Sequence, residues 1–327
     1  MDLTSRTLRF AVVIFLPLAH LSGVIFYGTG DPAHNTTAPT GPLEGSGWHL
    51  QGQWGAFCGT PIAPSHFLTA KHFAPQGNHF VLGETSYTVV DTMDDPESDL
   101  RICKIRETFP AFAPLYTKSD ETGKLLVLFG RGSKRGREVV RGTLRGWEWG
   151  SGDAVLRWGT NVATDLFDGG TAYGANLIGA DFDSDAGPDE ATLSPGDSGG
   201  GVFLRDGDVW KLAGVNSWVD GPYNTIASEN GAFFAALFLE DGFFLDSLQS
   251  GGRVSEPGSG PGSLYFTRIS SRLNWIKSVI GTKEMASTRP VRYTEAHADP
   301  PSFETRTDSL QSGECLLRCR AQPRTDR

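Results

Sequence analysis

The ten residues SPGDSGGGVF, Ser194 to Phe203, place one serine between an aspartate and two glycines. A serine hydroxyl is a weak nucleophile until a base takes its proton, and acyl transfer also needs N–H groups aimed at the developing oxyanion. Glycines permit a sharp turn that points backbone N–H groups into one concavity. The stretch therefore indicates Ser198 as a nucleophile, with the N–H groups of Gly196 and Ser198 as its oxyanion hole. An Asp–Ser turn without chemistry is the alternative.

The base should be a histidine elsewhere in the chain. Of the seven histidines, His72 stands out because it follows the apolar run FLTAK and so lies at the mouth of a strand. A base of this kind needs a carboxylate that holds the correct tautomer. Asp99, which opens the apolar run DLRICKI, is the candidate. Asp94, Asp95 and Glu97 lie in the polar turn MDDPES, and we expect them to be solvated loop charges.

The sequence from Trp48 onward consists of short apolar runs separated by Gly, Pro, Asn and Asp. Runs of this length with turn signals at close intervals predict an all-β sandwich or barrel. One helix is expected near the end, in SSRLNWIKSVIG, where Leu273, Ile276 and Ile280 share a face and Gly281 is the stop signal.

These stretches together resemble the trypsin/chymotrypsin-like serine proteases, and in particular exported bacterial members of that family. The matching stretches keep the family's order and cover about Trp48 to Gly281: FCGTPIAPSHFLTAKHF, SDLRICKI, SPGDSGGGVF, LAGVNSW and LYFTRISSRLNWIKSVI. The resemblance implies two six-stranded antiparallel β-barrels that divide near residues 114–126. It also implies an active site between the barrels and a closing C-terminal α-helix.

The resemblance implies a role for each matching residue. His72 would be the general base, Asp99 its orienter and Ser198 the nucleophile of a serine endopeptidase that works through an acyl-enzyme. Gly196 and the N–H of Ser198 would form the oxyanion hole. An extended substrate backbone would pair with the strand Ser217, Trp218 and Val219.

Two positions bear on the residue that would precede the cut, P1. Thr192 stands six residues before the nucleophile, at the family's pocket-base position, and its lack of negative charge argues against Lys or Arg at P1. Val219 replaces a common glycine on the pocket wall, and its side chain narrows the slot. A small or medium apolar P1 residue is therefore expected.

The chain departs from the family in its cysteines and in its activation. Phe73 occupies the place of a cysteine that usually pairs with the position of Cys58, so we expect Cys58 to pair with Cys103 or to stay free. The remaining two cysteines, Cys315 and Cys319, could pair locally or stay free.

No Lys or Arg occurs between Arg9 and Lys71, so no trypsin-type cut can create the N-terminal amine that in the family pairs with the aspartate before the nucleophile, here Asp197. We expect either constitutive activity after export or activation by a protease of another specificity. Asp197 would then need a different partner.

The N-terminus carries a targeting signal. Arg6 and Arg9 precede an apolar run from Phe10 to about Tyr27, which predicts a signal peptide or a membrane anchor over residues 1–30. Residues 31–47 are expected to be a linker, residues 220–260 an insertion, and residues 282–327 a disordered tail. The Phe-rich insertion could pack on the domain or form a lid. Secretion or a periplasmic location follows, with possible membrane attachment.

The composition of the chain limits the classes of partner that we expect. The net charge of −9 leaves no basic surplus to neutralise phosphates, so nucleic acid is not expected as a partner. Protein or peptide substrates are expected, and no cofactor. The acidic stretch DFDSDAGPDE, residues 181–190, suits either a Ca²⁺ site or an acidic surface loop.

Two other functions remain open. One is a catalytically silent binding protein on a protease scaffold, since a fold does not fix a function. The other is an esterase, although the order His, Asp, Ser and the all-β setting differ from the strand–turn–helix context of G-x-S-x-G enzymes.

Overall fold

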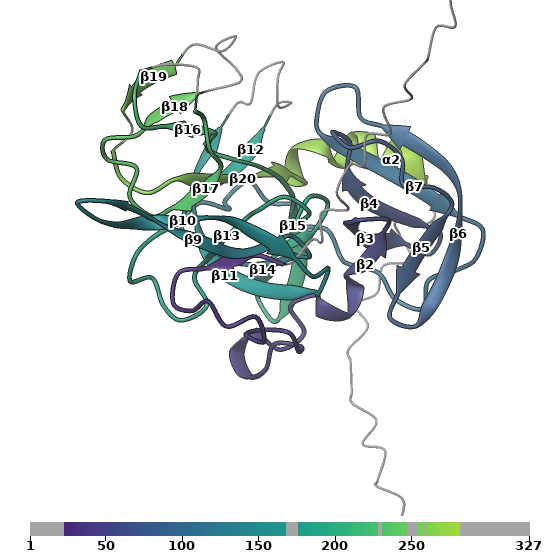
Figure 1. The fold of residues 1–327 in the computed structure, drawn as a ribbon. Coiled ribbons are helices and arrows are strands. Elements are labelled where there is room, and N and C mark those ends of the chain that lie inside the picture. Colours follow the sequence, from purple (N-terminus) through teal and green to yellow (C-terminus); the bar gives the residue numbers. More distant parts are fainter. Residues whose placement is uncertain (1–22, 168–175, 228–230, 247–253, 258, 282–327) are drawn as a thin grey trace, which may run out of the picture. The chain divides into compact units, whose positions relative to one another are not determined.

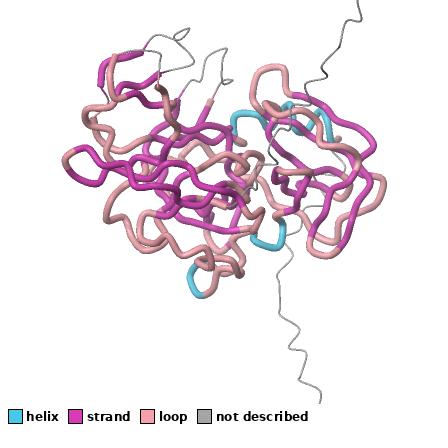
Figure 2. The backbone as a smooth tube through the Cα atoms, viewed as in Figure 1, coloured by secondary structure: helices cyan, strands magenta, loops and turns pink. Residues whose placement is uncertain are grey.

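The computed structural model describes residues 23–167, 176–227, 231–246, 254–257 and 259–281. These residues are mostly strands, which form two closed six-stranded antiparallel barrels followed by a short helix (Figures 1 and 2). The predicted all-β fold class is therefore confirmed, and the arrangement fits a trypsin-like fold. The predicted barrel boundary, residues 114–126, spans the end of the connection between the barrels and the first residues of the second one.

The first barrel closes in the order β2-β3-β4-β7-β6-β5. Its strands are β2 (Gly52–Trp54), β3 (Phe57–Ala63), β4 (His66–Ala70), β5 (His79–Leu82), β6 (Thr85–Asp94) and β7 (Leu100–Ile105). Every residue of β4 is buried, and Phe67 on this strand stacks on Phe80 with ring centroids 4.0 Å apart. Gly52 makes room for that pair, because a Cβ there would lie 2.0 Å from the Phe80 ring. Burial of one such ring contributes about 1.5–3 kcal/mol.

The second barrel closes in the order β11-β12-β20-β15-β14-β8. Its strands are β8 (Leu125–Gly130), β11 (Arg157–Phe167), β12 (Leu177–Asp181), β14 (Gly201–Asp206), β15 (Val209–Val219) and β20 (Ser263–Arg268). Leu126, Leu128 and Phe266 are fully buried in its core. The connection from β13 (Ala191–Thr192), which forms a two-stranded sheet with β1, to β14 of the barrel contains the GDSGG turn. A strand therefore stands at each end of that turn.

The closing helix α2 (Leu273–Ile280) follows a 3-10 turn, η4 (Ser270–Arg272), and the chain leaves it at Gly281 with φ 80°. Ile276 and Ile280 are buried in the core cluster that also holds the first barrel's side chains, so the helix ties the second barrel to the first. The predicted helix and its stop are confirmed.

One loop carboxylate next to this helix was predicted wrongly. Asp95 is fully buried rather than solvated, and it accepts hydrogen bonds from Arg272 at 2.6 and 2.7 Å and from Ser98 at 2.6 Å. These hydrogen bonds to charged and polar donors hold the pKa of the Asp95 carboxyl below its usual value, against the opposing effect of burial. A short polar turn can thus anchor a helix that lies far away in the sequence.

The domain begins well before Trp48. Strand β1 (Ile25–Phe26) pairs with β13, and Ile25 lies opposite Thr192. Val24 and Phe26 are buried in the core of the second barrel. The predictions of a leader reaching residue 30 and a linker over residues 31–47 are therefore wrong for residues 23–47, because these residues pack on the domain. The rest of the predicted leader, and the predicted tail, lie outside the described residues.

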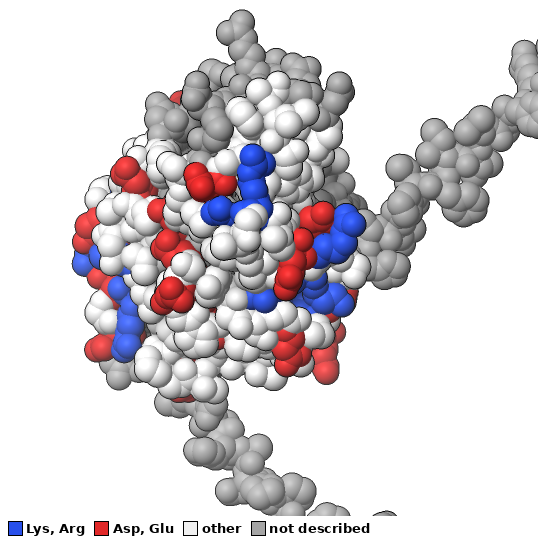
Figure 3. Space-filling view, turned by 60° about the vertical axis from the view of Figure 1, so that its left-hand side comes forward, with Lys and Arg blue, Asp and Glu red and all other residues white. Residues whose placement is uncertain are grey.

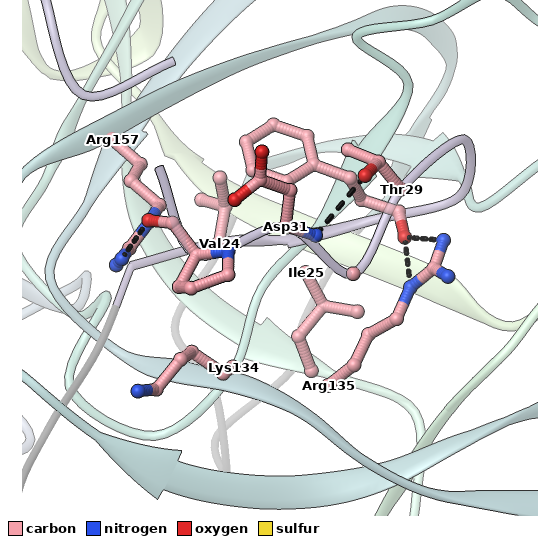
Figure 4. Close-up of a pocket in the computed structure, with 10 residues that line it drawn as sticks. Val24, Ile25, Thr29, Asp31, Lys134, Arg135 and Arg157 are labelled. Carbon is pink, nitrogen blue, oxygen red and sulfur yellow. Dashed lines mark hydrogen bonds between the residues drawn. The ribbon is translucent and has the colours of Figure 1, made fainter. Parts of the chain in front are cut away.

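Two arginines fasten this N-terminal arm, residues 23–37, to the second barrel (Figure 4). Arg135 donates through Nε to the carbonyl of Phe26 at 2.7 Å, and Arg157 donates through Nε to the carbonyl of Pro32 at 3.1 Å. Arg135 also lies over the Trp147 ring, 3.5 Å from its centroid. A pocket with an empty volume of about 230 Å³, part of it open solvent, lies between the arm and these side chains.

Two three-stranded sheets extend the second barrel. One has the order β17-β10-β9, with β9 (Ser133–Arg141), β10 (Thr143–Gly152) and β17 (Ala235–Leu237); the other joins β16 (Tyr223–Asn224), β18 (Phe244–Asp246) and β19 (Val254–Pro257). In the insertion, Phe243 is buried and Phe238 packs edge-on against Tyr27. Phe234 stacks on Trp149 and stays 46% exposed. The described part of the insertion thus mainly packs on the domain.

Candidate active site

The structure brings three predicted residues into one hydrogen-bonded line. Ser198 Oγ lies 2.8 Å from His72 Nε2, and His72 Nδ1 lies 2.7 Å from Asp99 Oδ2. His72 and Asp99 belong to the first barrel, just beyond β4 and just before β7, while Ser198 belongs to the second. The site therefore exists only where the barrels meet.

Asp99 is buried and fully satisfied by four donors. Its Oδ1 accepts from the backbone N–H of Lys71 at 3.1 Å and of His72 at 2.7 Å. Its Oδ2 accepts from the hydroxyl of Ser217 at 2.6 Å as well as facing His72. A carboxylate held in this way fixes which ring nitrogen of His72 carries the proton, and leaves Nε2 as the acceptor toward Ser198.

The GDSGG turn is shaped for anion binding. Gly196 has φ 98° and Gly199 has φ 80°, conformations that side-chain-bearing residues rarely adopt. Within the described part of the chain, the N–H groups of Gly196 and Ser198 donate no hydrogen bond to another protein group. Two N–H groups left free beside a nucleophilic oxygen are what an oxyanion hole requires.

Asp197 points away from Ser198 into the second barrel, where it is 1% exposed. Its Oδ1 accepts from Gly132 N at 2.7 Å. Its Oδ2 accepts from Ser194 N at 2.8 Å and from Ser194 Oγ at 2.9 Å. Burial raises the pKa of the Asp197 carboxyl to about 7, and the hydrogen bonds and the charge of Arg157 oppose that rise. These donors are the different partner that the sequence left unnamed.

Glycines line the space around that carboxylate. A Cβ on Gly130 would lie 1.9 Å from Asp197 Oδ1, and a Cβ on Gly132 would lie 2.4 Å from Ser194 Oγ. Neither position has room for a side chain, because atoms separated by so little overlap sterically. The backbone of residues 130–132 can therefore approach the turn only because both residues are glycine.

The predicted substrate strand forms the end of β15. Ser217 is buried against Asp99, while Trp218 lies beside His72, with their ring centroids 4.8 Å apart. Val219 pairs with Leu264 on β20 and packs against the core of the second barrel.

The predicted pocket-base residue lies on β13. Thr192 is 3% exposed and is paired with Ile25 of the N-terminal arm. The arm thus supports the strand that leads into the GDSGG turn.

The two described cysteines are free thiols, so the expected Cys58–Cys103 pairing is not made. Cys58 is on β3 and Cys103 on β7, and β4 lies between these strands. Two strand spacings amount to about 9.5 Å, beyond the roughly 7 Å that a disulfide tolerates between Cα atoms. Burial raises the pKa of Cys58 to about 12 and raises that of Cys103 as well. Cys315 and Cys319 lie outside the described residues.

The acidic stretch 181–190 folds around a buried carboxyl. Glu190 accepts hydrogen bonds from Asn161 Nδ2 at 2.9 Å and from Asp183 N at 3.2 Å, and burial raises its pKa to about 8. Across the described ranges, no group of three or more His, Cys, Asp or Glu side chains could hold a metal ion. The calcium interpretation gains no support.

Surface charge and membrane-spanning helices are two features that bear on possible partners. On the face in Figure 3, acidic and basic side chains are interspersed among uncharged ones, and no broad basic patch is visible there. A search of the described residues finds no helix with the length and apolar character needed to cross a membrane.

Sequence reasoning missed the residues that hold Asp197. Ser194 opens the stretch SPGDSGGGVF, but nothing local shows that its hydroxyl faces Asp197. Gly132 lies 65 residues from Asp197, so only the fold reveals the contact. The bond from Ser217 to Asp99 spans 118 residues and was equally invisible.

No protein-family model matches the chain, and no curated protein matches it.

Proposed function

We propose that the protein is a serine endopeptidase that hydrolyses peptide bonds through an acyl-enzyme. The observation that carries the proposal is the unbroken line of hydrogen-bonding atoms from Ser198 Oγ through His72 to Asp99, with distances of 2.8 and 2.7 Å. Each role that acyl transfer needs has a residue in reach: a nucleophile, a base, an orienting carboxylate and free N–H groups.

The chemistry follows from that line. His72 Nε2 takes the proton of Ser198 Oγ as the oxygen attacks the substrate carbonyl, and Asp99 stabilises the imidazolium that forms. The N–H groups of Gly196 and Ser198 donate to the oxyanion of the tetrahedral intermediate. His72 then gives its proton to the departing amine, which leaves an ester on Ser198. Water, deprotonated by His72, hydrolyses this ester and restores the enzyme.

The proposed preference is for a small or medium apolar P1 residue. Thr192 offers no carboxylate for a Lys or Arg side chain. The nearest acid in the sequence, Glu190, already accepts from Asn161 and Asp183, and its raised pKa favours the neutral form near pH 7. Val219 adds bulk to the adjoining strand. An exported location is part of the proposal and rests only on the sequence of residues 1–22.

The test is labelling with a fluorophosphonate probe, which reacts only with an activated serine, followed by digestion of a peptide library read by mass spectrometry. The wild-type protein should label once, and Ser198→Ala should abolish labelling and cleavage. Ser278→Ala is the matched control, because that exposed hydroxyl on α2 donates only to the carbonyl of Trp275. It should leave both readouts unchanged.

Probe labelling and peptide cleavage together distinguish the endopeptidase from the two alternative functions. Cleavage of peptides after small or medium apolar residues supports the endopeptidase. Labelling and ester hydrolysis without peptide cleavage would point to an esterase. A folded protein that neither labels nor cleaves would contradict the proposal and favour a silent binding protein on the same scaffold.

A further inference from the structure

The buried carboxylate of Asp197 has no cationic partner among the described residues. No described Lys, Arg or His side chain forms an ion pair with it, and all its donors are neutral: Gly132 N, Ser194 N and Ser194 Oγ. Arg157 lies near enough to lower the Asp197 pKa, yet its guanidinium is occupied by Asp153 at 2.8 and 3.0 Å and by the carbonyl of Pro32.

The Ser194 hydroxyl joins two segments. Its oxygen accepts a hydrogen bond from Ser133 N at 2.6 Å. Its hydroxyl has two acceptors in reach, Asp197 Oδ2 at 2.9 Å and, farther away, the carbonyl of Ser133 at 3.3 Å. Ser133 opens β9, while Ser194 and Asp197 begin and end the turn that precedes the nucleophile, where Asp197 N donates to Ser194 O at 3.1 Å. One hydroxyl thus ties the turn to residues 132–133.

The position of Asp197 decides the position of the oxyanion hole, because it lies between the two residues whose N–H groups form that hole. Its carbonyl is held as well, by Asn216 Nδ2 at 2.9 Å and by Gly200 N at 3.1 Å. A carboxylate that accepts several N–H and O–H bonds stays in place without a charge partner. If one donor is lost, both the carboxylate and the peptide groups beside it are free to shift.

We propose that Ser194 is a positioning residue which, together with the N–H of Gly132, holds Asp197 and so forms the oxyanion hole without a free N-terminal amine. The catalytic part of this inference rests on the proposed endopeptidase function. Its consequence is that the active turn assembles in the intact chain, and no activating cut is needed.

The N-terminal arm suggests an alternative mechanism, in which an N-terminal amine pairs with Asp197. Gly23 packs against the same region: a Cβ there would lie 2.9 Å from the carbonyl of Gly130, which itself borders Asp197. A chain that began at Gly23 would therefore bring its amine near the carboxylate. The two mechanisms differ in whether that amine is required.

The first experiment compares Ser194→Ala with Ser194→Thr, which keeps the hydroxyl, in peptide hydrolysis and in amide hydrogen exchange. Ser194→Ala should lower kcat about 10- to 100-fold with little change in KM, since a misplaced oxyanion hole affects the transition state more than binding. Ser194→Thr should recover most of kcat. Amide exchange should speed up for residues 196–200 in Ser194→Ala alone.

Hydrogen exchange keeps the inference separate from the enzyme proposal. If Ser194→Ala exchanges faster than the wild type and neither protein hydrolyses peptides, the role of Ser194 is supported and the endopeptidase proposal is contradicted. Unchanged kcat and unchanged exchange in a correctly folded Ser194→Ala protein would overturn the role of Ser194. Should this variant fail to fold, Asp197→Asn gives the same comparison, because its side-chain amide has one acceptor oxygen and an NH2 group in place of the second oxygen.

The second experiment tests the amine directly. The full chain, a chain beginning at Gly23, and that shorter chain with its amine acetylated should label with the fluorophosphonate at equal rates. Labelling confined to the shorter chain with a free amine would overturn the inference and show that processing activates the protein. Probe binding to none of the three would contradict the enzyme proposal, and the exchange comparison above would still decide the role of Ser194.

Discussion

Ser217 and His72 share one carboxylate oxygen: Asp99 Oδ2 accepts from the Ser217 hydroxyl at 2.6 Å and lies 2.7 Å from His72 Nδ1. The strand expected to pair with substrate is thereby connected to the residue that orients the base. This oxygen is one point of contact between the two barrels, because Ser217 comes from β15 and Asp99 from the loop before β7.

Ser217→Ala should lower kcat about tenfold and leave KM nearly unchanged. The change removes one hydrogen bond to a charged acceptor, worth about 1.5–3 kcal/mol, and leaves three others on Asp99. Steady-state hydrolysis of a peptide identified in the library measures the effect. A tenfold rise in KM with constant kcat would show instead that Ser217 serves substrate binding.

Asp99→Asn should cost far more, about 10⁴-fold in kcat, while the protein folds normally. An amide can donate to His72 Nδ1 and so favours the tautomer that places the proton toward Ser198. Fluorophosphonate labelling should slow in parallel, and far-UV circular dichroism checks the fold. Retention of more than a tenth of the wild-type rate would argue against the role assigned to Asp99.

Arg135→Ala should lower the free energy of unfolding by about 1–3 kcal/mol, because it removes hydrogen bonds to the N-terminal arm and a cation–π contact with Trp147. Arg137→Ala is the matched control: its side chain is 85% exposed and pairs with Glu148 at the surface. A surface pair of this kind contributes about 0–1 kcal/mol. Urea unfolding measures both, and equal losses would show that Arg135 does not fasten the arm.

Gly130→Ala should abolish labelling or prevent folding, because the new Cβ would lie 1.9 Å from Asp197 Oδ1. Gly30→Ala is the control within the arm, since its Cβ would come no closer than 3.5 Å to another residue's side chain. It should label like the wild type. A fully active Gly130→Ala protein would mean that the turn tolerates displacement of Asp197.

Stability should fall as the pH rises through the neutral range. Burial raises the pKa of Glu190 to about 8 and that of Glu240 to about 7, whereas an unfolded Glu titrates near about 4.3. Between these values the folded state binds more protons than the unfolded state, so higher pH favours unfolding. Tm should therefore be higher at about pH 5.5 than at about pH 8.5.

Glu240→Gln should reduce this pH dependence, because the amide keeps an acceptor for the Tyr223 hydroxyl, now 2.7 Å from Glu240 Oε1, and carries no titrating group. The measurement is the difference in Tm between the two pH values for variant and wild type. An unchanged difference would show that Glu240 does not titrate with folding.

The sequence predicted the parts of the molecule that carry local signals. The GDSGG turn needs glycines at positive φ, the strand FLTAK places His72 at its end, and the helix ends at Gly281. Each of these depends on neighbours along the chain. They were enough to predict an all-β sandwich or barrel and to select three residues that lie within hydrogen-bonding distance. The division into two six-stranded barrels was implied by the resemblance to trypsin-like proteases.

What the sequence did not predict depends on distant partners. The apolar segment Val24–Phe26 has the composition of a leader, and only its pairing with Ala191 and Thr192 reveals a strand. Asp95 was expected in solvent because its partner Arg272 lies 177 residues away. Of the two alternatives for Cys58, the free thiol is confirmed and the pairing with Cys103 is wrong. The positions of strands β3, β4 and β7 set the distance between the two cysteines, which closeness to the motifs in sequence does not show.

A pair of stacked aromatic rings packs beside His72, the proposed base. Phe73 follows His72, and its ring lies parallel to that of Phe57 with centroids 3.9 Å apart. Cys58, next to Phe57, is a buried free thiol. The segment that carries His72 is therefore held to its barrel by ring stacking and apolar burial rather than by a disulfide. A change of redox potential does not break these contacts. A reducing agent should leave the geometry of His72 intact.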